Sequence, residues 1–135
     1  MSARSSDSIL EPKLHIAVSA VFLDEQSLPE DNIYLWAYYI KIINGYDEPV
    51  VIKKRVFEVI DVVGQHQLIE GIGIANNEPT VLSKETFEYA SGVLLNQPSG
   101  FFFGYYEVLH KNGSFTREVV PSFSLDSKYD HLINQ

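Results

Sequence analysis

The sequence from Phe101 to Val120 reads FFFGYYEVLHKNGSFTREVV and decides the fold. Two runs rich in aromatic and β-branched residues, Phe101 to Leu109 and Ser114 to Val120, flank Lys111-Asn112-Gly113. Asn-Gly between two such runs is among the clearest local signals of a β-hairpin. This stretch therefore predicts two antiparallel strands joined by a tight turn.

Five further segments have the alternation or the composition of strands. They are Leu14 to Phe22, Ile33 to Ile43, Val50 to Val62, Gln65 to Ile74 and Thr86 to Ala90. Turn residues separate them, and Ser91-Gly92 is expected to end the last one. Without a 3.6-residue periodicity, this pattern indicates an all-β sandwich or a barrel. We favour a sandwich of about seven antiparallel strands, because one open sheet would leave an apolar face in water.

A chain of 135 residues fits one domain. We expect residues 12–125 to form it, with an N-terminal tail of residues 1–11 and a C-terminal tail of residues 126–135. The predicted central strand places Trp36, Tyr38, Ile40 and Ile42 on one face, which we assign to the core. Their expected packing partners are Phe57, Val59, Phe87, Tyr89, Phe102, Tyr106 and Val108.

Charge and cysteine content exclude several classes of function. A net charge of −8 opposes binding to nucleic acid, because a polyanion would be repelled. The absence of cysteine rules out disulfides, a thiolate nucleophile and cysteine-based zinc sites. No apolar run matches a secretory leader or a membrane-spanning helix. We therefore predict a cytoplasmic protein with no membrane partner.

Several segments, in this order and spacing, resemble the ApaG family from about Leu14 to Leu125. They are Leu35 to Asn44, Arg55 to Asp61, Glu70 to Gly73, Phe87 to Gly92, Pro98 to Gly100 with Gly104 to Tyr106, and Pro121 to Leu125. The resemblance implies a fibronectin type III-like sandwich. It also implies the association of bacterial ApaG proteins with cobalt and magnesium efflux, and the role of related eukaryotic domains as interaction modules. Neither association supplies a reaction.

Three positions depart from the family pattern. Asn76 stands where a third glycine is usual after Gly71 and Gly73, Phe57 replaces a usual tryptophan, and Val56 replaces a usual histidine. These differences identify a divergent member of the family.

The glycine pair near residue 71 is a candidate anion site, because glycine lets main-chain N–H groups approach a phosphate closely. Gly71, Gly73, Asn76 and Asn77 would line it, and Arg55 would supply positive charge. No helix follows, so a dinucleotide-binding site of the Rossmann type is excluded. The alternative, which we favour, is a bulged edge strand in which the glycines relieve crowding.

No catalytic or metal motif stands out. The four histidines, at positions 15, 66, 110 and 131, are too far apart for a typical ligand pair, and we expect them at the surface. Acidic pairs such as Asp24 and Glu25 lack the spacing of a calcium loop. A Gly-x-Ser-x-Gly nucleophile turn is absent. The sequence therefore predicts no enzyme, no cofactor and no metal site.

The run from Phe101 to Tyr106 places aromatic side chains on both faces of one strand. Phe102 and Tyr106 share one face, whereas Phe101, Phe103 and Tyr105 share the other. A sandwich buries only one face of each sheet, so the second row is either covered by loops or exposed as an interaction surface.

Two functions follow from these features. The leading hypothesis is a non-enzymatic module that binds a protein partner or itself through Phe101, Phe103 and Tyr105. The alternative is a sensor of a phosphate-bearing small ligand, or of a metal–phosphate complex, at the loop from Gly71 to Asn77.

Overall fold

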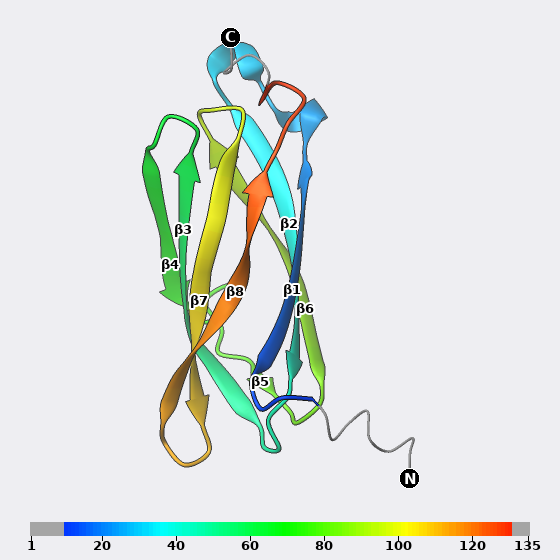
Figure 1. Ribbon diagram of the computed structural model, residues 1–135, viewed down its shortest axis with the longest axis vertical. Helices are drawn as coiled ribbons and strands as arrows, with labels where there is room; N and C mark the ends of the chain where they lie inside the picture. Colours follow the sequence, from blue (N-terminus) through cyan, green and yellow to red (C-terminus); the bar gives the residue numbers. More distant parts are fainter. Residues whose placement is uncertain (1–9, 131–135) are drawn as a thin grey trace.

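Two antiparallel sheets pack face to face in the computed structural model, which describes residues 10–130 (Figure 1). The smaller sheet has the order β1-β2-β6. Its strands are β1 (Leu14–Phe22), β2 (Tyr34–Asn44) and β6 (Thr86–Leu95). Two short 3₁₀ helices, Asp24–Gln26 and Pro29–Asp31, connect β1 to β2.

The larger sheet has the order β4-β3-β7-β8, with β5 paired to the start of β3. Its strands are β3 (Val50–Asp61), β4 (His66–Ile72), β5 (Thr80–Val81), β7 (Gly100–His110) and β8 (Phe115–Leu125). The predicted antiparallel sandwich is confirmed, with eight strands in the described residues rather than about seven. β8 lies beside β1 and closes one side of the sandwich (Figure 1).

Two strands, β6 and β8, continue five residues past the ends that the sequence predicts. β6 continues through Ser91-Gly92, which we expected to end it, and stays in register with β2 as far as Leu95. β8 continues through Pro121, because its ladder with β7 shifts register between the pairs Phe102–Phe123 and Gly104–Val120. This irregularity leaves Pro121 unpaired, so its missing N–H costs the sheet no hydrogen bond.

The core lies between the sheets and is rich in aromatic rings. The predicted stripe of Trp36, Tyr38, Ile40 and Ile42 is buried, as are its predicted partners on β3 and β7. Phe87 and Tyr89 of β6 are half-buried and pack against the same cluster. The alternation rule therefore identified the core correctly.

Residues 126–130, placed in a tail by the sequence, contact the core. The indole Nε1 of Trp36 donates a 2.8 Å hydrogen bond to the carbonyl oxygen of Asp126. The ring of Tyr129 lies with its centre 6.0 Å from the rings of Phe22 and Tyr34. Residues 1–9 of the predicted N-terminal tail and residues 131–135 lie outside the described residues. Within residues 10–130, no helix is long and apolar enough to cross a bilayer.

Candidate functional site

Strand β7 presents one aromatic row to the core and a second row to the outside of the larger sheet. Phe102 and Tyr106 are 0% exposed. Phe101, Phe103 and Tyr105 take the outer face, as the alternation predicts. Phe101 is 47% exposed, whereas Phe103 and Tyr105 are half-buried. The fold therefore brings the three predicted interaction residues together on one surface.

Neighbouring strands extend this surface with apolar side chains. The register pairs Phe101 with Ile60 of β3, and it pairs Tyr105 with Val56 of β3 and Val119 of β8. Val119 is 73% exposed. We call this surface the aromatic face; it consists of Val56, Ile60, Phe101, Phe103, Tyr105 and Val119.

Charged groups of both signs border the aromatic face. The guanidinium carbon of Arg117 lies 4.6 Å from the centre of the Tyr105 ring, which is a cation–π distance. Arg117 Nε also lies 3.9 Å from a carboxylate oxygen of Glu107. Glu58 is paired in register with Phe103. The aromatic face therefore combines apolar side chains with a few charged groups, a mixture that also occurs in surfaces that bind protein.

The side chain of Arg55 organises the predicted ligand loop. Its Nη1 donates hydrogen bonds to the carbonyl oxygens of Ile72, at 2.9 Å, and Gly73, at 3.1 Å. The guanidinium lies over Gly71, where an added Cβ would be 2.8 Å from Nη2. Glycine at position 71 therefore makes room for the guanidinium of Arg55.

Asn76 and Asn77 lie in a tight turn just after Gly73. Ile74 and Asn77 exchange two main-chain hydrogen bonds of 2.9 Å. Ala75 and Asn76, between them, have left-handed φ angles of 52° and 63°. A Cβ on Gly73 would collide with the carbonyl oxygen of Asn77. The turn thus accounts for Gly73 and for asparagine at position 76, a residue that tolerates this conformation.

Most main-chain donors of this loop already have acceptors. The N–H of Gly73 donates to the carbonyl oxygen of Lys53 at 2.8 Å, and those of Ile74 and Asn77 are used within the turn. For Arg55 Nε and Nη2, the structure records no acceptor within residues 10–130. Any anion at this loop would therefore be held chiefly by Arg55.

Buried Tyr106 and half-buried Tyr89 connect the sheets beside Arg55. The hydroxyl groups of Tyr89 on β6 and Tyr106 on β7 are hydrogen-bonded to each other. Burial raises the pKa of Tyr89 to about 12. Burial, followed by the effect of Tyr89, raises the pKa of Tyr106 further. Both hydroxyls stay protonated near neutral pH, so neither is suited to act as a general base.

Glu118 is the centre of a buried polar network that the sequence analysis missed. Its carboxylate accepts hydrogen bonds from the Leu14 N–H at 2.7 Å, from Tyr46 Oη at 2.7 Å and from Thr116 Oγ1 at 2.6 Å. Burial, and then the bond to Glu118, raises the pKa of Tyr46. Glu118 and Val120 are two positions apart on β8, so their side chains share one face of the strand. This spacing from an apolar residue was the sequence signal that could have placed Glu118 between the sheets.

His110 extends the same network, and its expected surface position is wrong. His110 is buried. Its Nε2 is hydrogen-bonded to Thr116 Oγ1 at 2.8 Å, and its ring centre lies 4.6 Å from that of Tyr46. His66 is exposed beside Glu58, His15 is half-buried, and His131 lies outside the described residues. Residues 10–130 contain no group of three or more His, Cys, Asp or Glu arranged to hold a metal ion.

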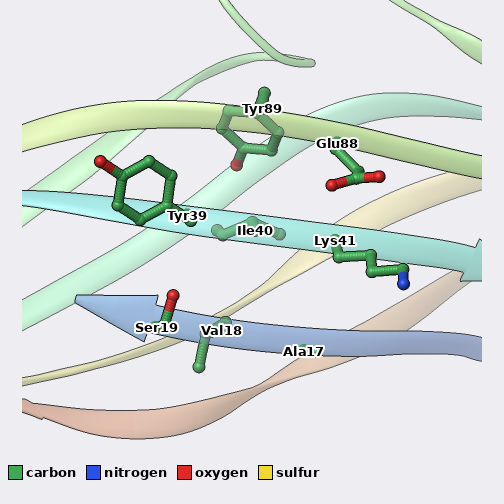
Figure 2. Close-up of a pocket in the computed structure, with 8 residues that line it drawn as sticks. All are labelled: Ala17, Val18, Ser19, Tyr39, Ile40, Lys41, Glu88 and Tyr89. Carbon is green, nitrogen blue, oxygen red and sulfur yellow. The ribbon is translucent and has the colours of Figure 1, made fainter.

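The outer face of the smaller sheet differs from the aromatic face. It carries an open hollow of about 440 Å³ around Tyr39, lined by short side chains such as Ala17 and Ser19 (Figure 2). Lys41 and Glu88, which are paired across β2 and β6, lie at its end. Tyr39 is 48% exposed but has small neighbours: Ser19 on β1 and Ala90 on β6.

Comparison with known proteins gives consistent matches over most of the chain. The ApaG domain family matches residues 24–110. A Protein ApaG from Agrobacterium fabrum is 37% identical over 114 residues, which cover 84% of this chain and 88% of that protein. A Protein ApaG from Paramagnetospirillum magneticum is 34% identical, with 87% and 90% covered.

A solved structure agrees with these sequence matches. It is a crystal structure described as an ApaA protein from Bordetella pertussis, and it superposes with a TM-score of 0.82 at 29% identity, covering 86% of this chain and 94% of that one. Family match, sequence identity and fold coincide over the same sandwich. The chain belongs to the ApaG family.

Proposed function

We propose that the protein is a non-catalytic binding module that engages a protein partner through the aromatic face. One observation carries this proposal: adjacent phenylalanines on β7 have opposite environments, with Phe102 fully buried and Phe101 47% exposed. Exposed aromatic side chains beside apolar residues lose little conformational entropy on binding and bury a large area, so they favour association.

The chemistry of the aromatic face supports a protein as the partner. Its six defining residues are uncharged, Glu58 lies opposite Phe103, and Glu107 and Arg117 lie beside Tyr105. The net charge of −8 disfavours nucleic acid. We further propose that the partner acts in cobalt and magnesium homeostasis in the cytoplasm, the setting that the resemblance to the ApaG family implies.

The test is affinity capture from the native cell with three immobilised forms of the protein. Wild type and Tyr39→Ser should retain the same partner, and the double variant Phe101→Ser with Phe103→Ser should lose it. Tyr39 is a matched control, because its exposure of 48% is close to the 47% of Phe101 but it lies on the other sheet. Retention by the double variant would contradict the proposal, and so would loss of its folded state in a urea titration.

A second candidate function rests on Arg55. Its Nε and Nη2 are available beside Gly71 and Gly73, so the loop could hold a phosphate-bearing small ligand or a metal–phosphate complex. Calorimetry with pyrophosphate, nucleotides, Mg²⁺ and Co²⁺ tests it. Binding heat should disappear in Arg55→Met and persist in the control Lys54→Met, whereas no heat across the panel would rule it out.

A further inference from the structure

Strand β6 forms a free edge of the smaller sheet. It pairs with β2 in continuous register from Thr86 to Leu95, and no described strand pairs with its other side. The N–H of Asn44 donates to the carbonyl oxygen of Glu85, which sets the phase of the ladder. Odd-numbered residues of β6 therefore bond to β2. The even-numbered residues, from Thr86 to Leu94, direct N–H and C=O groups outward.

Other edges of the described sandwich are blocked or interrupted. β1 lies beside β8, and the outward N–H of Leu14 is bonded to Glu118. β8 contains Pro121 at its irregularity. β4 is only seven residues long. In contrast, β6 has ten residues, no proline, no register shift and a single charge, Glu88. Apart from Glu88, it lacks the features with which proteins protect an edge from pairing.

Gly92 on β6 has no explanation within the described chain. Each of the other seven glycines has either a left-handed φ angle or a neighbouring atom within 3.0 Å of an added Cβ. At Gly92 the nearest atom is the carbonyl oxygen of Trp36, at an ordinary 3.5 Å, and no left-handed angle occurs. A larger side chain would fit there in a single copy, so the space it leaves is available to a second molecule.

We propose that two copies of this chain pair antiparallel through β6, with a two-fold axis at Ala90. Ala90 has outward N–H and C=O groups, so the two alanines can exchange both hydrogen bonds. The same register places Glu88 opposite the partner's Gly92 and Tyr89 opposite the partner's Ser91. In both of these pairs a large side chain meets a small one, and the two Glu88 carboxylates stay apart.

Charge favours this register over alternatives. Two copies that each carry −8 repel one another, and an axis at Glu88 would add two carboxylates side by side. Centring the axis on Ala90 removes that contact and joins the smaller sheets into one of six strands. The aromatic face belongs to the other sheet and stays exposed on each copy, so the dimer would offer two binding surfaces. The pairing does not depend on the proposed function.

Cysteine cross-linking tests the register directly, because the chain has no cysteine of its own. Opposed residues that exchange hydrogen bonds have Cα atoms about 5.5 Å apart, within the range of a disulfide. Ala90→Cys should therefore form a covalent dimer on mild oxidation. Ser19→Cys, exposed on β1 of the same sheet, should remain monomeric on a non-reducing gel. Equal cross-linking of the two variants would overturn the proposal.

Sedimentation of the full chain tests the association itself. Wild type should move from 15.3 kDa towards twice that mass as its concentration rises from about 1 µM to about 1 mM. Ala90→Pro should stay monomeric and folded, because the N–H it loses does not bond to β2. Gly92→Lys gives a second variant should the proline unfold the chain. A monomeric wild type, or a dimer lost in the Phe101→Ser, Phe103→Ser variant and kept in Ala90→Pro, would overturn the pairing.

Discussion

The two faces of strand β7 place phenylalanines in opposite environments: one face is buried in the core and the other is partly exposed. Phe102 stacks on Phe123, with ring centres 4.6 Å apart, and contacts Phe57 at 5.0 Å. Phe101, the residue immediately before it, pairs with Ile60 and Ser124 and remains 47% exposed. Hydrophobicity alone does not separate them. The phase of the strand separates them: the inner row packs in the core, whereas the outer row stays partly exposed.

The largest expected effect contrasts these two phenylalanines. Phe102→Ala should lower the free energy of unfolding by about 3–5 kcal/mol, because it removes a fully buried ring and leaves a cavity. Phe101→Ala should change it by less than about 1 kcal/mol, since much of that ring is already in water. Urea titrations of the two variants measure the contrast. Similar losses would mean that the outer row also belongs to the core.

A smaller loss is expected at Gly104, which continues the inner face of β7. Its φ angle is 155°, and an added Cβ would collide with the carbonyl oxygen of Val56 and lie 2.9 Å from the Phe57 ring. Gly104→Ala should therefore cost about 2–3 kcal/mol through overpacking. The control is Gly92→Ala on β6, where a Cβ has room. Thermal unfolding of the two proteins would show the difference, and equal midpoints would refute this account of Gly104.

The sequence was sufficient to predict the layers of this fold but not all its ends. Alternation identified the buried stripe of β2 and the two rows of β7, because one period-two rule governs every sheet. The sequence placed the end of β6 at Ser91-Gly92, because this pair is typical of a turn. The same two small residues also occur inside a strand, and local sequence does not distinguish the two cases. Tyr129 near the C-terminus escaped prediction because its contacts with Phe22 and Tyr34 depend on chain positions far apart.

The candidate sites show the same division. The fold brings Phe101, Phe103 and Tyr105 onto one surface, as strand phase alone predicts. At the glycine loop, the sequence suggested an anion nest of main-chain donors with Arg55 supplying charge, but the place of its guanidinium over Gly71 depends on the long-range pairing of β3 with β4. Such pairing is set by sheet topology, which local patterns do not specify.

An intermediate effect is expected at Glu118, which pairs in register with Tyr106 on the inner face of β7. Glu118→Gln keeps the shape but loses a charged acceptor for the Leu14 N–H and the Tyr46 hydroxyl. The free energy of unfolding should fall by about 1–3 kcal/mol. Glu107→Gln on the outer face is the control and should change it by less than about 0.5 kcal/mol. Amide exchange at Leu14 should accelerate only in the first variant; unchanged exchange there would contradict the bond.

The smallest effect concerns Tyr89, which bonds Tyr106 on the inner face of β7. Tyr89→Phe should cost about 1 kcal/mol near neutral pH, because the Tyr106 hydroxyl loses its partner. The pKa of Tyr89 is raised from 10.0 to about 12 in the folded chain. The unfolded chain therefore releases this proton first, so stability held below pH 10 is lost as the pH rises towards 12.

Above pH 10, the stability difference between wild type and Tyr89→Phe should accordingly shrink, as measured by urea titrations across the pH series. Subtracting the two curves removes the contribution of lysines and of other tyrosines, which titrate in both proteins. Tyr39→Phe removes a hydroxyl from an exposed ring, leaves the Tyr89–Tyr106 bond in place and serves as the control for the loss of one hydroxyl. A difference that stays constant from pH 8 to pH 12 would show that Tyr89 ionises equally in both states, and the inner row would then be open to water at this end of the sandwich.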